Sequence, residues 1–484
     1  MSHARPTAPR RDGDEPASPE RASETMTGAR GLVAFRAERI VQRLHRPLNP
    51  MWARGFRLLF VLDGGALLTV MIAINVVRFG ERWPNPVRFY VVGFVAATAI
   101  HLFVNYFAGL YEREPRLGGR PWLPRLVLAT GIGIAVQALG SLLWDRYLMP
   151  RWNLVWFAVL AVAVLALNRL IARTMLRARL GPPRVLLVGS DREVRRVGEH
   201  LDQSAREVVE VGSVGSADSA DGLVERIHES EATHVLFLDD DALPTVFPQP
   251  MQAIEAAGVG FLQRVTACDT LLGLRNVGQV AGVPFVRLHV HTIPSSQMRL
   301  KRALDLLLVT VGAVIWLPAL AVLSVYALVR AGRPILYRQE RVGRDGVPFT
   351  VVKFRTMIPD AEVGGAVLAS ADDDRIVPGM GWFRSTRADE LPQIFNVLGG
   401  SMSMVGPRPE RPELVTRFEA TVPGYARRLE VPPGLTGLAQ VHGRYSTDAE
   451  YKLGYDLQYI ANWSPVLDAQ IILRTVWVVL SRRV

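Results

Sequence analysis

Cysteine is almost absent from this chain: Cys268 is the only one among 484 residues. An intramolecular disulfide and a metal site built from several cysteines are therefore excluded. A cleavable signal peptide is not expected either, because residues 1–50 lack an apolar core and are rich in Arg, Glu, Pro, Ala and Ser. This composition favours a disordered, basic leader on the cytoplasmic side.

Long apolar runs, in contrast, are plentiful, and hydrophobic residues make up 49% of the chain. Four runs between residues 51 and 180 each approach the roughly 20 residues that cross a hydrocarbon core. Arginines cluster before the first run, between the second and third, and after the fourth, which places these segments and the rest of the chain in the cytoplasm. We therefore expect a multi-pass protein of the inner or plasma membrane, with an α-helical transmembrane bundle within residues 51–180. Its predicted spans are Leu58–Val77, Phe89–Leu110, Leu126–Trp144 and Leu154–Ile171.

Nucleic acid is a poor partner for this chain despite its net charge of +11. The basic residues cluster beside the apolar runs and do not alternate with aromatic residues along a groove. Membrane lipids and phosphate-bearing ligands are the partners that this pattern favours.

Residues 181–294 alternate short apolar runs with polar, helix-forming ones. Arg184–Val188, followed by Gly189, is typical of a buried strand that ends in a tight turn, and His234–Leu238 is a second apolar strand. We predict a cytoplasmic α/β domain of the Rossmann-like kind. Only Gly189 stands where a dinucleotide fingerprint needs three glycines, so a structural or regulatory role is favoured over cofactor binding.

The segment Arg384–Gln393 carries two adjacent acids, Asp389 and Glu390, before Pro392 and a short apolar run. Proline suits the first turn of a helix, so the pattern predicts a helix over Gln393–Leu398 with both carboxylates at its positive end. Acids in this place are most often capping residues. A carboxylate that the helix end keeps ionised is also a candidate nucleophile.

Several blocks around the acidic pair occur together in an order typical of one family. They are Arg341–Gly346, Phe349–Met357, the acidic segment, Asn396–Pro409 and Pro433–Gly437. From about Met298 to its end, the chain resembles the catalytic domain of bacterial polyprenyl-phosphate glycosyl-1-phosphate transferases. Larger members of that family carry four N-terminal spans and a Rossmann-like middle domain. The resemblance implies a catalytic domain over residues 295–484.

The resemblance also implies an activity: transfer of a sugar-1-phosphate from a UDP-sugar to undecaprenyl phosphate, with release of UMP. This step initiates exopolysaccharide, capsule or O-antigen synthesis. Asp389 is then the nucleophile, through a covalent aspartyl-phosphosugar intermediate, and Glu390 is its catalytic partner. Mg²⁺ would offset the diphosphate charge, with Asp389 or Glu390 as its ligands. The cations expected to bind phosphate are Lys353, Arg355, Arg384 and Arg408.

The catalytic region opens with an apolar segment, Ala303–Val329, that has Pro318 near its middle and basic residues at both ends. A full span would carry the rest of the chain away from cytoplasmic nucleotide sugars. A helix broken at Pro318 that enters one leaflet and returns keeps both ends cytoplasmic. We therefore expect a monotopic α/β catalytic domain with a re-entrant membrane helix over about residues 303–329, as in the resembled family.

Two positions depart from that family: Ser401 stands where Asp is common, and His442 where Asn is frequent. Two other functions stay open. One is a membrane-anchored, nucleotide-binding sensor or scaffold with a non-catalytic C-terminal domain. The other is a transferase that works through a ternary complex, although that class needs more spans than this chain offers. The sequence identifies neither the sugar nor the polysaccharide, and it leaves a homodimer open.

Overall fold

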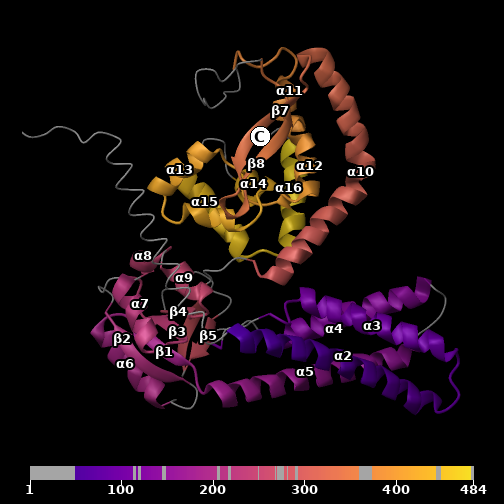
Figure 1. The fold of residues 1–484 in the computed structure, drawn as a ribbon, viewed down its shortest axis with the longest axis vertical. Coiled ribbons are helices and arrows are strands. Elements are labelled where there is room, and N and C mark those ends of the chain that lie inside the picture. Colours follow the sequence, from indigo (N-terminus) through magenta and orange to yellow (C-terminus); the bar gives the residue numbers. More distant parts are fainter. Residues whose placement is uncertain are drawn as a thin grey trace, which may run out of the picture.

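The computed structural model describes residues 49–480, except 113–115, 118–121, 144–148, 204–207, 216–219, 242, 249, 267–268, 270–276, 281, 289–292, 359–372 and 443–447. The predicted leader and Cys268 lie outside the described residues. Figure 1 shows three regions: a bundle of long helices, an α/β domain beside one end of it, and a larger C-terminal region.

Four long helices form the bundle, and each covers most of one predicted apolar run. By length and composition, all four can cross a membrane. Leu67, Phe94, Leu126 and Phe157, one from each helix, are at most 3% exposed and form the centre of its core. The apolar side chains on the outer faces are exposed, as lipid contact requires. The helices are α2 (Asn49–Phe79), α3 (Val87–Phe107), α4 (Trp122–Leu143) and α5 (Arg151–Leu180).

A buried ion pair joins the first and last of these helices. Arg169 of α5 lies 3.0 Å from the carboxylate of Asp63 on α2, and both side chains are at most 5% exposed. Tyr111 and Asn168 donate further hydrogen bonds to Asp63, each of 3.0 Å. In an apolar environment a charge is retained only when it is paired, so this cluster fixes how α2 and α5 face each other.

The α/β domain has one six-stranded sheet in the order β2-β1-β3-β4-β6-β5. Strands β1 to β4 are parallel, and β5 and β6 form an antiparallel pair at one edge. Along β1, Leu186 and Val188 pack into one hydrophobic cluster and Val185 and Leu187 into another, as expected of a sheet buried on both faces. The strands are β1 (Arg184–Val188), β2 (Val209–Val214), β3 (His234–Phe237), β4 (Gly260–Arg264), β5 (Val277–Val280) and β6 (Val283–Arg287). The helices are α6 (Asp191–Gln203), α7 (Ala220–Glu229), α8 (Leu243–Val246) and α9 (Met251–Ala256).

At the end of β1, where a phosphate would sit in a dinucleotide-binding domain, the chain supplies its own carboxylate. Asp239, just after β3, accepts a hydrogen bond of 2.9 Å from the backbone N–H of Ser190. A Cβ on Gly189 would lie 2.8 Å from the Cβ of Leu238, so this glycine serves close packing of two strand ends. This geometry is consistent with the incomplete fingerprint of the sequence.

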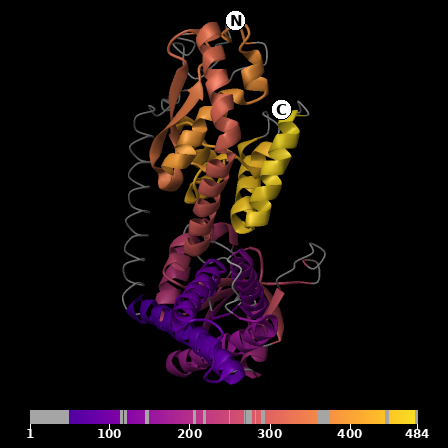
Figure 2. The ribbon, with the colours of Figure 1, turned by 90° about the vertical axis from the view of Figure 1, so that its right-hand side faces the viewer.

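The C-terminal region opens with α10 (Ser295–Ala331), a helix of 37 residues. The sequence predicted a helix broken at Pro318, but helical geometry continues through this residue. A proline removes one backbone N–H and crowds the preceding turn, which bends a helix without having to end it. The ribbon of α10 is bowed in Figure 1, and Figure 2 shows the same helix from the side, running from the bundle along the C-terminal region.

The rest of this region packs along α10. Val309 contacts a cluster that contains Val351 and Val397, and Ala327 contacts one that contains Phe354 and Phe383. Its strands are β7 (Leu336–Val342) and β8 (Pro348–Phe354), which are antiparallel, and β9 (Ser403–Val405) and β10 (Gly434–Thr436), which are parallel. Its α-helices are α11 (Gly381–Ser385), α12 (Ile394–Gly399), α13 (Pro412–Thr421), α14 (Leu438–His442), α15 (Ala449–Ala461) and α16 (Pro465–Leu480), and its 3-10 helices are η2 (Arg344–Gly346), η3 (Ala388–Gln393) and η4 (Tyr425–Glu430).

Candidate active site

The acidic pair lies on η3, and not at the start of an α-helix as the sequence predicted. Arg387 precedes it with φ 55°, and the N–H of Glu390 donates to the carbonyl of Arg387. Pro392 lies inside this 3-10 helix, and α12 begins only at Ile394 and has six residues. A helix this short has a weak dipole, so the local charges must come from side chains.

Those charges come from two other parts of the chain. Lys353, on β8, places its Nζ 3.2 Å from Oε1 of Glu390. Arg408, in the loop after β9, places its Nη2 2.8 Å from the same oxygen. Three segments that are separate in sequence thus meet at one carboxylate, and the structure brings Lys353, Glu390 and Arg408 together.

Glycine makes the loop of Arg408 possible. Strand β10 runs so close to the segment after β9 that a Cβ on Gly434 would lie 2.1 Å from the amide nitrogen of Gly406. A Cβ on Gly437 would lie 2.2 Å from the carbonyl oxygen of Gly406. No side chain fits at either position, which explains why the Pro-Gly-Leu-Thr-Gly block accompanies the Gly-Pro-Arg-Pro block.

The two acids have opposite pKa shifts. Burial, and then the negative charge of Glu390, raise the pKa of Asp389 to about 6. Burial also opposes ionisation of Glu390, but Arg408 and Lys353 outweigh it and hold the pKa of Glu390 well below its usual range. The sequence predicted that a helix end keeps a carboxylate ionised. For Glu390, two cations do this instead.

Asp389 differs from Glu390 in its contacts as well. Within the described part of the chain, no hydrogen bond or ion pair reaches the Asp389 carboxylate, which is only partly buried. Lys353, Arg384 and Arg408 lie near enough to lower its pKa electrostatically. Asp389 therefore has no such bond among the described residues, whereas Glu390 is held by two cations.

A small pocket opens beside the pair. Its lining includes Lys353, Glu390, Gln393 and Arg408 on the polar side, with Val351 and Leu435 on the apolar side. Burial lowers the pKa of Lys353, and Glu390 opposes that shift. A negative ligand that enters here meets Lys353 and Arg408, which share one ion-pair partner, Glu390, among the described residues, so the pocket favours an anion such as a phosphate.

The other predicted cations are placed differently. Arg384, on α11, acts on Asp389 only through its charge. Arg355 follows the last residue of β8, and its guanidinium donates to the carbonyl of Ala331 at the end of α10. Phosphate binding by Arg355 is therefore not supported by its geometry: it bonds to the end of the membrane helix.

The two departures from the family pattern have structural contacts. Ser401 lies with Asn396 at the end of α12, where its hydroxyl donates to the Asn396 carbonyl over 3.2 Å. His442 ends α14 and stacks on Tyr455, with ring centroids 5.7 Å apart. Neither contacts the acidic pair among the interactions of the described residues.

Sequence reasoning missed two cations beside the site. Arg387 lowers the pKa of Glu390, and Arg341 lines the pocket. Both lie in segments that the sequence had singled out: Arg387 stands close before the acidic pair, and Arg341 opens the Arg-Val-Gly block. These positions could have indicated a role at the site.

Comparison with known proteins gives the same region a family. The bacterial sugar transferase family matches residues 296–482. A UDP-glucose:undecaprenyl-phosphate glucose-1-phosphate transferase of Klebsiella pneumoniae is 38% identical over 204 residues, which are 41% of this chain and 44% of that protein. A UDP-N-acetylgalactosamine-undecaprenyl-phosphate N-acetylgalactosaminephosphotransferase of Aeromonas hydrophila is 36% identical over 185 residues, 38% of this chain and 44% of that protein.

A third relative is matched over most of its length. The UDP-glucose:undecaprenyl-phosphate glucose-1-phosphate transferase of Caulobacter vibrioides is 38% identical over 181 residues, 36% of this chain and 68% of that protein. The matches to the first two relatives cover less than half of their lengths. The shared part contains the acidic pair, its cations and α10, and the chain belongs to the bacterial sugar transferase family.

Proposed function

We propose that this protein transfers a sugar-1-phosphate from a UDP-sugar to undecaprenyl phosphate through a covalent intermediate on Asp389. One observation carries the proposal: of two adjacent carboxylates, Glu390 is paired with Lys353 and Arg408, while the partly buried Asp389 lies near the same cations without a bond to them among the described residues. The names of the relatives, which join a UDP-sugar to undecaprenyl phosphate, support the donor and the acceptor.

In the first half-reaction, an oxygen of Asp389 attacks the phosphorus that bears the sugar. The bond from this phosphorus to the oxygen of UMP breaks, and UMP leaves with the electron pair. Arg408 and Lys353 offset the negative charge that gathers on the phosphoryl oxygens. Their ion pairs with Glu390 hold them in place before the substrate arrives.

In the second half-reaction, a phosphate oxygen of undecaprenyl phosphate attacks the same phosphorus. The bond to Asp389 breaks, the carboxylate is regenerated, and the product is a lipid diphosphate that carries the sugar. Such a product starts a polysaccharide chain on its lipid carrier. Two displacements on one phosphorus let donor and acceptor use the same anion pocket in turn, which suits its small size.

Mg²⁺ fits the donor set only in part. Among the described residues no group of three or more His, Cys, Asp or Glu side chains could hold a metal. Mg²⁺ is, however, often held by one or two carboxylates together with substrate phosphates, and Asp389 and Glu390 supply such oxygens. When bound there, the ion would neutralise diphosphate charge.

We also propose that α10 is re-entrant and that the site faces the cytoplasm. The start of α10 lies against the end of α3, where Arg299 donates to the hydroxyl of Tyr106 over 2.9 Å. Both halves of α10 pack on the catalytic domain. In Figure 1 the bundle helices lie roughly horizontal, whereas α10 runs roughly perpendicular to them. The convex side of its curve faces away from the α/β domain. These arrangements support a helix that enters the membrane and returns.

The proposal is tested by trapping the intermediate. Purified full-length protein is mixed with Mg²⁺ and UDP-glucose or UDP-N-acetylgalactosamine without lipid acceptor, quenched rapidly, and examined by peptide mass spectrometry. We expect a phosphosugar adduct on Asp389 and one equivalent of UMP. Asp389→Asn should form neither, because a neutral amide is a poor nucleophile.

The control is Asp345→Asn, which changes an exposed acid outside the pocket. It should form the adduct like the wild type. An adduct at another residue, or full UMP release by Asp389→Asn, would refute the role of Asp389.

A further inference from the structure

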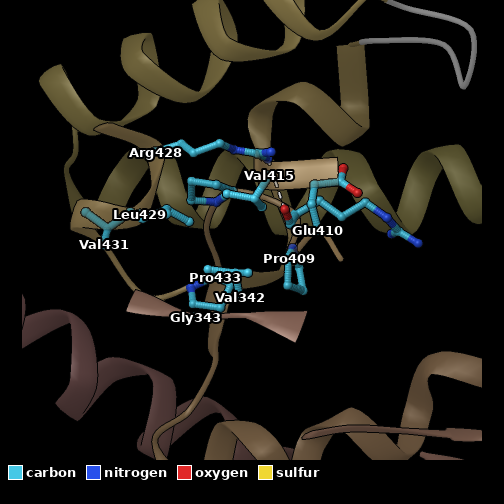
Figure 3. A pocket seen from close by; sticks show the side chains of 11 residues that line it. Val342, Gly343, Pro409, Glu410, Val415, Arg428, Leu429, Val431 and Pro433 are labelled. Atoms are coloured by element: carbon cyan, nitrogen blue, oxygen red, sulfur yellow. Dashed lines mark hydrogen bonds between the residues drawn. The ribbon is translucent and has the colours of Figure 1, made fainter. Parts of the chain in front are cut away.

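The loop that carries Arg408 is held at every backbone carbonyl from Pro407 to Glu410. Two of the four donors are backbone amides and two are arginine side chains. The carbonyls accept as follows: Pro407 from the N–H of Gly434 (2.9 Å), Arg408 from Arg428 (2.9 Å), Pro409 from Arg341 (3.2 Å) and Glu410 from the N–H of Val342 (3.0 Å). A second small pocket lies behind this loop. Figure 3 shows Arg428, Pro409, Glu410 and Val342 around it.

Arg428 is the donor that reaches the backbone of Arg408 itself. Its side chain is 4% exposed and forms an ion pair of 2.9 Å with Asp456, which is 2% exposed. Its guanidinium also lies 5.0 Å from the ring centroid of Tyr425 and donates to the hydroxyl of that residue. A planar, fully charged fork can hold a carboxylate and a carbonyl in one fixed geometry, which an ammonium group cannot do.

A second domain contacts the helix that carries Arg428. On η4, Glu430 accepts a hydrogen bond of 2.7 Å from Gln252 of α9, and the guanidinium of Arg427 lies 5.6 Å from the ring centroid of Phe247. These contacts flank Arg428 in sequence. The α/β domain therefore packs directly on the element that holds the loop of Arg408.

We propose, on the basis of the proposed function, that Arg428 is a positioning residue for Arg408 and that the α/β domain acts on the site through η4. Arg428 holds the backbone of Arg408, and Arg408 holds Glu390 and the phosphate. Contacts of Phe247 and Gln252 with η4 set where Arg428 lies. This gives the α/β domain an effect on catalysis without a ligand site of its own.

A merely structural role for the buried Arg428 and Asp456 pair makes a different prediction. Replacing both members of a buried ion pair by apolar residues of similar volume is often neutral or stabilising for a fold. The double variant Arg428→Met with Asp456→Leu therefore keeps the packing but removes the donor to the Arg408 carbonyl. If the pair only stabilises the fold, a folded double variant keeps its activity.

The experiment measures the thermal midpoint and the kcat and KM for UDP-glucose of the full-length double variant in nanodiscs. We expect an unchanged midpoint, a kcat lowered about tenfold and a nearly unchanged KM, as typical coupling between contacting residues predicts. Wild-type kcat in a folded double variant would overturn the positioning role. Failure of the wild type to release UMP from a panel of UDP-sugars that includes UDP-glucose and UDP-N-acetylgalactosamine would instead refute the proposed function.

A second variant covers the case in which the double variant does not fold. Arg428→Lys keeps the charge beside Asp456 but loses the fork. In the wild-type background this substitution should lower kcat about tenfold. In an Arg408→Lys background it should lower kcat much less, because both substitutions then affect the same Arg408 interaction. Equal losses in the two backgrounds would show that Arg428 does not act through Arg408.

The contribution of the α/β domain is tested with Phe247→Ala combined with Gln252→Ala. We expect kcat to fall several-fold, with no further fall when Arg428→Lys is present. The matched control, Glu229→Ala, changes an exposed acid of the same domain and should leave kcat unchanged. Wild-type kcat in the Phe247 and Gln252 double variant would refute action through η4.

Discussion

The ionisation of Asp389 gives the sharpest prediction for the chemistry. With a pKa of about 6, this carboxyl is mostly ionised at neutral pH and mostly protonated at pH 5. If only the ionised form attacks phosphorus, the rate should fall about tenfold between about pH 7 and pH 5. An aspartate at its ordinary pKa would remain ionised over the whole range, and the rate would hardly change.

The assay must isolate the first half-reaction. The acceptor is a phosphate monoester, and such groups titrate near pH 6 themselves. Single-turnover release of UMP, with UDP-glucose and without lipid, avoids this overlap because the donor has no group that titrates in this range. The rate is measured from pH 5 to 8 at saturating donor.

Glu390→Gln tests the physical cause of the shift. It removes the negative neighbour that raises the pKa of Asp389 and leaves Lys353 and Arg408 without their carboxylate. All these changes favour ionised Asp389, so the acid limb of the profile should move to lower pH even though the rate at neutral pH falls. Asp345→Asn is the control with an unchanged limb. A limb that is absent in the wild type, or that does not move in Glu390→Gln, would refute the reasoning.

Three further predictions concern stability and topology. Asp389→Asn should raise the thermal midpoint at pH 8, because the fold disfavours the ionised carboxylate above its pKa, and most of this gain should be lost by about pH 4, where the carboxyl is protonated in the folded protein and about half protonated in the unfolded chain; a lower midpoint at pH 8 would contradict this. Single cysteines at Arg299 and Gly332, in a Cys268→Ser background, should both be labelled from the cytoplasmic side of oriented vesicles, and labelling from opposite sides would establish a fifth span. Arg355→Met should lower the midpoint while first-turnover UMP release stays within about twofold, because its guanidinium bonds to the end of α10 and not to the pocket; a large loss of rate would restore Arg355 to phosphate binding.

Local sequence patterns sufficed for the membrane helices and for the first strands of the sheet. Apolar run length depends only on neighbouring residues, so each predicted span falls on one helix, although the predicted span Phe89–Leu110 runs three residues past the end of α3 at Phe107. Helix α5 continues nine residues past the predicted end at Ile171 to Leu180, since its last turns are basic and no longer need lipid. The antiparallel strands β5 and β6 were not predicted, because Gly282 and Pro284 interrupt their apolar pattern.

The candidate site was found as a motif, but its electrostatics were not. The ionisation of Glu390 depends on Lys353, which is 37 residues away, and on Arg408, which is 18 residues away. The contact of Arg355 with the end of α10 was missed for a related reason. Two residues apart on a strand, Lys353 and Arg355 should share a face, but β8 ends at Phe354 and the alternation ends with it.

Helix α10, a candidate membrane helix by length and composition, is also part of the site's framework. Asp305 of α10 accepts hydrogen bonds from the Ser403 hydroxyl (2.7 Å) and from the N–H of Met404 (3.2 Å), both on β9. Lys301, one turn earlier, lies 2.9 Å from Asp468 at the start of α16. Strand β9 leads directly into the loop of Arg408, so α10 fixes the origin of that loop while Arg428 fixes its carbonyl. We therefore expect a shift of α10 to reach Arg408 through β9, because the contacts of Asp305 tie the two elements together.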